Sequence, residues 1–315
     1  GYIMYQVKTL NKISPVGLAH LTESYILTDK TEDADAILVR SQDMHEMEFS
    51  EKLEAIARAG AGVNNIPLDR CAKAGIVVFN TPGANANAVK ELVLCGMLLA
   101  SRNVPAALTW AKGLTEDVSK TVEKGKSQFA GHEILGKTLG IVGLGAIGRK
   151  VAEAAKALGM NIVGYDPYYV SGGEGLTVYP DLAEMLPLCD IVTLHLPAND
   201  ATRGMVNKEF LASMKDGAIL LNFSRDKLVN DVDLLVALES GKLTQYVTDF
   251  PNDNLIGREH ITLLPHLGAS TAEAEDNCAT MAVMELRDYF ENGNIINSVN
   301  FPKVDMGPLG GLRRL

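Results

Sequence analysis

A glycine-rich turn between an apolar strand and an amphipathic helix limits the folds open to this chain more than any other feature. The apolar residues 139–142 lead directly into Gly143-Leu144-Gly145-Ala146-Ile147-Gly148, and the apolar positions that follow recur at helical spacing. Glycines at these three positions allow a tight turn, close approach of a pyrophosphate, and close packing of the helix on the strand. The turn therefore predicts a Rossmann-type nucleotide-binding domain.

A carboxylate follows at the position where such a domain binds ribose. A second apolar strand ends at Asp166, 18 residues after Gly148 (166 − 148), close to the usual spacing of about 20. A carboxylate accepts hydrogen bonds from a ribose 2′-hydroxyl and repels a 2′-phosphate, so Asp166 favours NAD over NADP as the cofactor.

Short apolar runs alternate with helical patterns along the whole chain, which is typical of parallel sheets with crossover helices. The first series begins with residues 34–41 as a strand, 51–60 as a helix and 75–82 as a strand, and the rhythm restarts at residue 138. We therefore expect an α/β protein with two doubly wound parallel sheets. The polar residues 112–137 between them are expected to form a connection or a surface excursion.

Composition excludes several functional classes. The 315 residues fit two domains, and 47% apolar with 22% charged residues is typical of a soluble globular protein. A net charge of -10 without a dense Lys/Arg run argues against a nucleic-acid partner. The absence of a long apolar run, or of a signal-peptide layout in residues 1–12, argues against a membrane partner and favours a cytoplasmic protein. The four cysteines are far apart, so we expect no metal site and four small buried side chains.

Two residues follow strands at the predicted edge of the second sheet. Arg225 follows the strand in residues 217–224, and His266 follows the strand in residues 260–265. Arginine can bind a carboxylate with two parallel hydrogen bonds, and histidine can transfer a proton near neutral pH. Taken alone, however, such an arginine is more often a surface ion-pair partner, and such a histidine is more often a packed ring.

A resemblance that covers nearly the whole chain favours the catalytic interpretation. The runs VRSQ, ARAGAGVNNI, VVFNTPGANANAVKEL, GKTLGIVGLGAIG, ILLNFSR, TDFP and LLPHLGAST resemble the D-isomer-specific 2-hydroxyacid dehydrogenases. Within that family the chain is most similar to the members that oxidise D-3-phosphoglycerate, a phosphorylated 2-hydroxy acid, with NAD at the entry to serine synthesis. The resemblance implies a homodimer. It also implies an NAD-binding domain, residues 97–281, inserted into a discontinuous substrate domain of residues 1–96 and 282–315.

The resemblance also assigns roles to individual residues. Arg225 corresponds to the cation that anchors the substrate, and His266 to the general acid and base. The positions that match cofactor contacts are Gly143, Gly145, Ala146, Ile147, Gly148, Asp166, Phe223, Ser224, Asp249 and Gly268, with Asp249 facing the nicotinamide carboxamide. The positions that match substrate contacts are Arg40, Ser41, Arg58, Gly62, Asn85 and Lys126.

The chain departs from the family pattern at two functional positions. Family members carry a glutamate that pairs with the catalytic histidine, whereas this chain reads TDFPNDNL, so Asp253 or Glu259 would have to take its place. A Trp-x-Arg run of the family is replaced by Lys124-Gly125-Lys126, where a lysine offers a point charge in place of the planar guanidinium. Two alternatives stay open, namely a glyoxylate, hydroxypyruvate or other D-2-hydroxyacid reductase, and a non-enzymatic NAD-binding scaffold similar to transcriptional corepressors.

Overall fold

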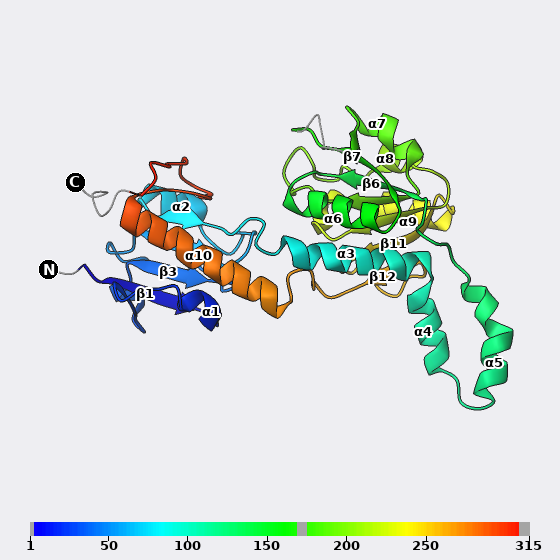
Figure 1. The fold of residues 1–315 in the computed structure, drawn as a ribbon, viewed down its shortest axis with the longest axis horizontal. Coiled ribbons are helices and arrows are strands. Elements are labelled where there is room, and N and C mark those ends of the chain that lie inside the picture. Colours follow the sequence, from blue (N-terminus) through cyan, green and yellow to red (C-terminus); the bar gives the residue numbers. More distant parts are fainter. Residues whose placement is uncertain (1–2, 169–174, 309–315) are drawn as a thin grey trace. The chain divides into compact units, whose positions relative to one another are not determined.

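The computed structural model describes residues 3–168 and 175–308, which form two α/β units (Figure 1). Unit 1 comprises Gly1–Asn85 and Ala269–Leu315, and unit 2 comprises Ala86–Gly268. The predicted boundaries at 96/97 and 281/282 lie instead inside two continuous helices. The first of these helices packs on elements of the second sheet and its crossover helix, and the other packs on elements of the first sheet, so each belongs wholly to one unit.

Unit 1 is built on a five-stranded parallel sheet with the order β2-β1-β3-β4-β5. Its strands are β1 (Tyr5–Leu10), β2 (Tyr25–Leu27), β3 (Ala36–Val39), β4 (Ala55–Arg58) and β5 (Val77–Phe79). Its helices are α1 (Pro15–Leu18), η1 (Thr31–Asp33), α2 (Leu68–Lys73) and the long α10 (Ala272–Asn292). Apolar side chains cover both faces of the sheet, and α10 packs on one of them.

Strand β4 corrects the prediction of a helix in residues 51–60. Ala55, Ile56 and Ala57 are fully buried between β3 and β5. A strand buried on both faces loses the alternation of apolar and polar residues that identifies a strand in a sequence, and alanine is a strong helix former. The local pattern therefore resembled a helix, and burial in the centre of the sheet decided for a strand.

Unit 2 is built on a seven-stranded parallel sheet with the order β12-β11-β10-β9-β6-β7-β8. Its strands are β6 (Thr138–Val142), β7 (Asn161–Tyr165), β8 (Thr177–Val178), β9 (Ile191–Leu194), β10 (Ala218–Asn222), β11 (Leu243–Thr248) and β12 (Ile261–Leu263). Its crossover helices are α6 (Ala146–Ala157), α7 (Leu182–Met185), η3 (Leu186–Leu188), α8 (Lys208–Ser213), η4 (Asp226–Leu228) and α9 (Asp231–Glu239). The strand order reverses between β6 and β9, so a ligand crevice is expected at the carboxyl ends of these two strands.

Helix α3 (Ala86–Ser101) packs against α6, β10 and β11, and its apolar face contributes to the core of unit 2. The predicted surface excursion, residues 112–137, contains α5 (Val118–Gly125) and η2 (Lys126–Phe129). Together with the preceding helix α4 (Val104–Lys112) they form an arm that extends from unit 2 (Figure 1). Among the described residues no single helix is long and apolar enough to cross a membrane, and α3 with α4 meets that test only as a pair bent by 69°.

The cysteine prediction holds for three of the four side chains. Cys71, Cys189 and Cys278 are buried, whereas Cys95 is exposed on α3. The sulfur of Cys189 packs against Gly140 of β6, because a Cβ on Gly140 would lie 2.4 Å from it.

Candidate active site

The glycine turn after β6 has a conformation and a packing that only glycine allows. Gly143 has a φ of +105°, and a Cβ there would lie 2.3 Å from the carbonyl oxygen of His195. A Cβ on Gly148 would lie 2.0 Å from the carbonyl oxygen of Gly143. The turn therefore lies directly against the end of β9, at the point where the strand order reverses.

Gly145 differs from the other two glycines because no atom lies within 4 Å of the Cβ it lacks. It is the N-cap of α6, and Ala146 and Ile147 are the first residues of that helix. The backbone N–H groups and the partial positive charge of the helix N-terminus are suited to bind a diphosphate in this open space.

Asp166 lies at the end of β7, and its buried carboxylate is bound to the same turn. One oxygen accepts a hydrogen bond from the backbone N–H of Leu144 at 2.7 Å, and the other accepts one from Tyr168 at 2.9 Å. The carboxylate thus stands beside the glycine turn, where a ribose would follow the diphosphate. Together the glycines, the open helix N-terminus and Asp166 fit a dinucleotide.

The two predicted catalytic residues emerge from the same edge of the same sheet. Arg225 follows β10 and His266 follows β12, and β11 lies between these strands. Neighbouring strands are about 4.8 Å apart, so strands two positions apart end about 10 Å from each other. Both side chains are exposed. The Arg225 guanidinium donates a hydrogen bond to the backbone carbonyl oxygen of Ser224 at 2.6 Å.

Asp249 directly follows β11, the strand between β10 and β12, and is fully buried. One of its oxygens accepts a hydrogen bond from the Gly268 backbone N–H at 2.9 Å, and the other has no partner among the described residues. Burial raises the pKa of Asp249, while the Gly268 N–H and the charge of His266 act in the opposite direction. Asp249 is therefore a carboxylate close enough to affect His266, whose ring lies 4.7 Å from that of Phe250.

Asp253, which the sequence suggested as a partner of His266, is exposed in the loop after β11. Among the described residues no hydrogen bond or ion pair joins Asp253 to His266. The side-chain amide of the neighbouring Asn252 donates hydrogen bonds to Asp226 and Asp231. Asp249 is better placed for this role than Asp253 or Glu259, which is exposed as well.

Two predicted cofactor residues, Phe223 and Ser224, and His195 stabilise this edge of the sheet. Phe223 is buried, and its ring fills the space that a Cβ on Gly96 would need. The Ser224 hydroxyl donates to the Leu196 carbonyl oxygen at 2.5 Å, which ties the end of β10 to the end of β9. The ring of His195 bonds to the Thr193 hydroxyl at 2.9 Å, and burial lowers the pKa of His195 to about 3. His195 is therefore neutral at pH 7 and is expected to position the turn rather than transfer protons.

In unit 1, Arg40 directly follows β3, and Arg58 is the last residue of the neighbouring strand β4. The Arg40 carbonyl oxygen accepts hydrogen bonds from the Arg58 side chain at 2.7 Å and from Asn65 at 3.1 Å. The Asn11 side-chain oxygen accepts the backbone N–H groups of residues 40, 41 and 42 at 3.3, 3.0 and 2.9 Å, which fixes Ser41. Sequence reasoning missed Asn11. Its sequence signal is weak: an asparagine directly after β1, a residue type that tolerates the left-handed φ of 67° found there.

The other predicted substrate residues occupy different surroundings. Gly62 lies in the loop after β4, which is held by an Asn80 bond to the Ala61 carbonyl oxygen at 2.8 Å. Asn85 is the last residue of unit 1 before α3. Lys126 lies in η2, which packs on α4 and α5, and its ammonium pairs with Glu123 at 2.8 Å on the surface of the arm. Lys126 therefore belongs to the arm and not to the strand ends of unit 2.

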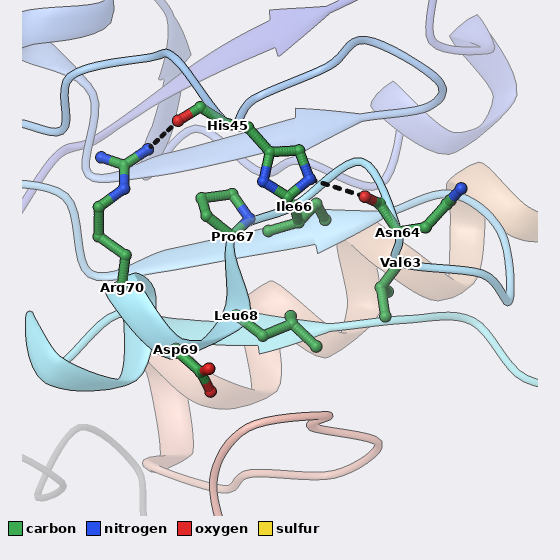
Figure 2. A pocket seen from close by; sticks show the side chains of 8 residues that line it. All are labelled: His45, Val63, Asn64, Ile66, Pro67, Leu68, Asp69 and Arg70. Carbon is green, nitrogen blue, oxygen red and sulfur yellow. Dashed lines mark hydrogen bonds between the residues drawn. The ribbon is translucent and has the colours of Figure 1, made fainter. Parts of the chain in front are cut away.

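A pocket of about 570 Å³ lies beside the same loop of unit 1 (Figure 2). Two hydrogen bonds join polar groups that line it: the His45 ring contacts the Asn64 carbonyl oxygen at 2.7 Å, and Arg70 donates to the His45 carbonyl oxygen at 3.0 Å. The lining residues are His45, Val63, Asn64, Ile66, Pro67, Leu68, Asp69 and Arg70. We therefore regard these polar side chains as a brace for the loop that carries Gly62.

Comparisons with known proteins agree with this geometry. The sequence model described as "D-isomer specific 2-hydroxyacid dehydrogenase, NAD binding domain" matches residues 94–268, which is more than half of the chain. The chain belongs to this family. It thus carries the NAD-binding domain of the family in the unit that holds the glycine turn and Asp166.

Similar proteins point to two activities. The chain is 36% identical to a D-3-phosphoglycerate dehydrogenase of Methanocaldococcus jannaschii over 98% of the chain and 59% of that protein, and 36% identical to one of Rattus norvegicus over 87% and 52%. The chain thus spans between half and three fifths of the length of these relatives. The fold is similar to an NADPH-dependent glyoxylate/hydroxypyruvate reductase of Sinorhizobium meliloti, with a TM-score of 0.80, 25% identity, and coverage of 94% and 97%. It is also similar to an NAD+-bound 3-phosphoglycerate dehydrogenase of Entamoeba histolytica, with a TM-score of 0.74, 27% identity, and coverage of 95% and 99%.

Proposed function

We propose that this chain oxidises D-3-phosphoglycerate to 3-phosphohydroxypyruvate with NAD, which is the first step of serine biosynthesis. The observation that carries the choice of substrate is the pair of guanidinium groups of Arg40 and Arg58 on adjacent strand ends of unit 1. The carboxylate of a 2-hydroxy acid needs one such cation, and Arg225 supplies it. The two cations of unit 1 suit a phosphate group.

The residues at the strand ends of unit 2 have complementary roles in this proposal. NAD bound at the glycine turn would supply the acceptor for the hydride that leaves C2 of the substrate. Arg225 binds the substrate carboxylate with two parallel hydrogen bonds and so fixes the position of C2. The imidazole of His266 accepts the proton of the C2 hydroxyl. The Asp249 carboxylate stabilises the resulting imidazolium, and its unpaired buried oxygen would accept a hydrogen bond from the nicotinamide carboxamide.

Two substitutions test these roles. Arg225→Ala removes two charge-assisted hydrogen bonds, each worth about 1.5–3 kcal/mol, so kcat/KM should fall by at least about 100-fold. His266→Asn removes the proton acceptor and should lower kcat by about 100- to 10,000-fold. NAD affinity, measured by calorimetry, should stay within about threefold in both variants, since neither residue is assigned to NAD. A kcat/KM within a few-fold of the parent would refute the corresponding role.

The second candidate function is reduction of glyoxylate or hydroxypyruvate, which the similarity to the Sinorhizobium meliloti reductase favours. These substrates lack a phosphate, so they make no use of Arg40 and Arg58. Comparing kcat/KM for phosphoglycerate, glycerate, glyoxylate and hydroxypyruvate distinguishes the two activities. A preference for an unphosphorylated substrate would favour the second, and no turnover of any 2-hydroxy acid would favour a scaffold.

We further propose that the protein is a homodimer that uses the arm of α4 and α5. No residue of these two helices is buried, and Leu108 and Val118 are 55% and 51% exposed. Trp110 of α4 packs on Phe129 of η2, with 5.6 Å between ring centroids, and this contact joins the two ends of the arm. Leu108→Asp should shift sedimentation toward the monomer, whereas Val236→Asp, at a site 61% exposed on α9, should not. If both variants sedimented alike, the proposal that the arm forms the dimer interface would be contradicted.

A further inference from the structure

Arg40 is engaged by a carboxylate of its own chain. Its guanidinium donates to the Lys12 carbonyl oxygen at 3.3 Å and forms an ion pair with Glu275 at 3.1 Å. Both side chains are about half exposed, at 40% and 48%, so the pair is reachable by a ligand. Glu275 lies in the first turn of α10, whose N-cap Thr271 accepts from Ala274 at 3.0 Å.

Hydrogen bonds fix the backbone around Arg40, so only the Arg40 side chain can change its position when a ligand binds. Strand order in unit 1 reverses between β1 and β3, and Asn11 and Arg40 directly follow these two strands. In sheets of this order ligands bind at such a reversal point. Here the Asn11 oxygen already occupies the converging backbone N–H groups, so an incoming anion must rely on side chains.

Those side chains form a compact group of mixed charge. The charges of Arg40, Arg58 and Glu275 all act on the thiol of Cys278, one turn along α10 from Glu275. Two guanidinium groups and one carboxylate leave a single net positive charge. The carboxylate opposes an incoming anion in two ways, because it occupies a donor of Arg40 and because it repels negative charge.

We infer that Glu275 is a specificity-determining residue of this anion site: it pairs with Arg40 until the phosphate of the substrate displaces it. The inference rests on the proposed function for the identity of the ligand. A phosphate dianion has the charge and the oxygen atoms to displace a carboxylate from a guanidinium. A substrate that ends in a hydroxyl group has neither, so it leaves the ion pair intact. Glu275 therefore weakens the binding of phosphorylated substrates and has little effect on unphosphorylated ones.

Glu275→Gln tests the inference, since glutamine keeps the shape and can still accept a hydrogen bond from Arg40. An exposed ion pair is worth up to about 1 kcal/mol, so the affinity for inorganic phosphate, measured by calorimetry, should rise by on the order of fivefold. The kcat/KM ratio of phosphoglycerate to glycerate should rise by a similar factor through KM. Glu275→Asp should restore parental behaviour. Glu273→Gln is the matched control, because Glu273 is exposed in the same first turn and carries the same charge.

A double substitution separates this mechanism from a general change in surface charge. In an Arg40→Ala background Glu275→Gln should no longer change phosphate affinity, because the partner is gone. Equal affinities of parent and Glu275→Gln, an equal gain in Glu273→Gln, a gain that persists without Arg40, or no phosphate binding in any variant would each overturn the inference. If the phosphate data follow the expected pattern while phosphoglycerate is not oxidised, the proposed function fails and the role of Glu275 stands.

Discussion

Two glycines of the same turn should respond in opposite ways to the same substitution. A Cβ on Gly148 would lie 2.0 Å from the Gly143 carbonyl oxygen and 3.3 Å from Cγ2 of Ile141. A carbon and an oxygen normally stay about 3.3 Å apart, so Gly148→Ala must move α6 off β6 by more than about 1 Å. Overpacking of this kind costs about 3 kcal/mol, which lowers the Tm of a unit of this size by roughly 10 °C.

Gly145→Ala places its Cβ in open space, and the φ of −75° at this position suits alanine. Because Gly145 is an N-cap, the substitution should lower the free energy of unfolding by less than about 1 kcal/mol, so Tm should fall by at most about 3 °C. The added methyl group instead occupies the space where the diphosphate is expected. A clash of about 1–3 kcal/mol there weakens NAD binding by roughly 10- to 100-fold.

The assay pairs thermal unfolding without NAD, followed by circular dichroism, with calorimetric titration of NAD. The expected signatures are a large loss of stability for Gly148→Ala and a loss of affinity at nearly unchanged stability for Gly145→Ala. If Gly145→Ala lowered Tm as much as Gly148→Ala, or bound NAD within twofold of the parent, the placement of the diphosphate beside Gly145 would be wrong.

Three further predictions concern buried and exposed groups. Burial raises the pKa of Glu285 from 4.5 to about 8, so the folded chain keeps a proton that the unfolded chain releases, and stability should fall as pH rises between these values. Glu285→Gln should remove this slope and raise stability at pH 8 by about 2 kcal/mol in urea unfolding, and an unchanged slope would contradict the assignment. Native protein should show one thiol that reacts fast with a disulfide reagent, Cys95, because burial raises the pKa of Cys71 to about 11 and that of Cys189 to about 12. Asp166→Asn should lower NAD affinity and narrow the preference for NAD over NADP, and a preference that stays the same would remove Asp166 from cofactor selection.

The parts of the site that the sequence predicts are those encoded within a short segment. The glycine turn, the following helix and the spacing to Asp166 all lie within residues 138–168, so each step can be deduced from local sterics and helix geometry. Arg225 and His266 follow apolar strands, and parallel strands bring their carboxyl ends to one edge. The placement of these residues at one edge thus follows from strand direction alone.

The parts that the sequence does not predict depend on contacts between distant segments. Arg40 and Glu275 are 235 residues apart, and no local pattern joins them. Strand β4 resembles a helix until its burial between β3 and β5 is known. The unit boundaries follow the packing of α3 and α10, which a pattern of apolar residues shows only as two long helices.

The strand order reverses once in each sheet, but different groups are available to bind a ligand at the two reversal points. This difference determines how strongly each site can discriminate among ligands. At the reversal between β6 and β9, Gly145 leaves open space at the N-terminus of α6, so we expect an anion there to bind mainly to backbone N–H groups. At the reversal between β1 and β3, the Asn11 oxygen already accepts the backbone N–H groups of residues 40–42, so we expect an anion to bind to the side chains of Arg40 and Arg58. A site made of side chains can be retuned by one neighbouring carboxylate, as we infer for Glu275. Selection among substrates should therefore vary with single substitutions in unit 1, whereas cofactor binding in unit 2 should be most sensitive to the residues that shape the turn, namely its glycines and Asp166.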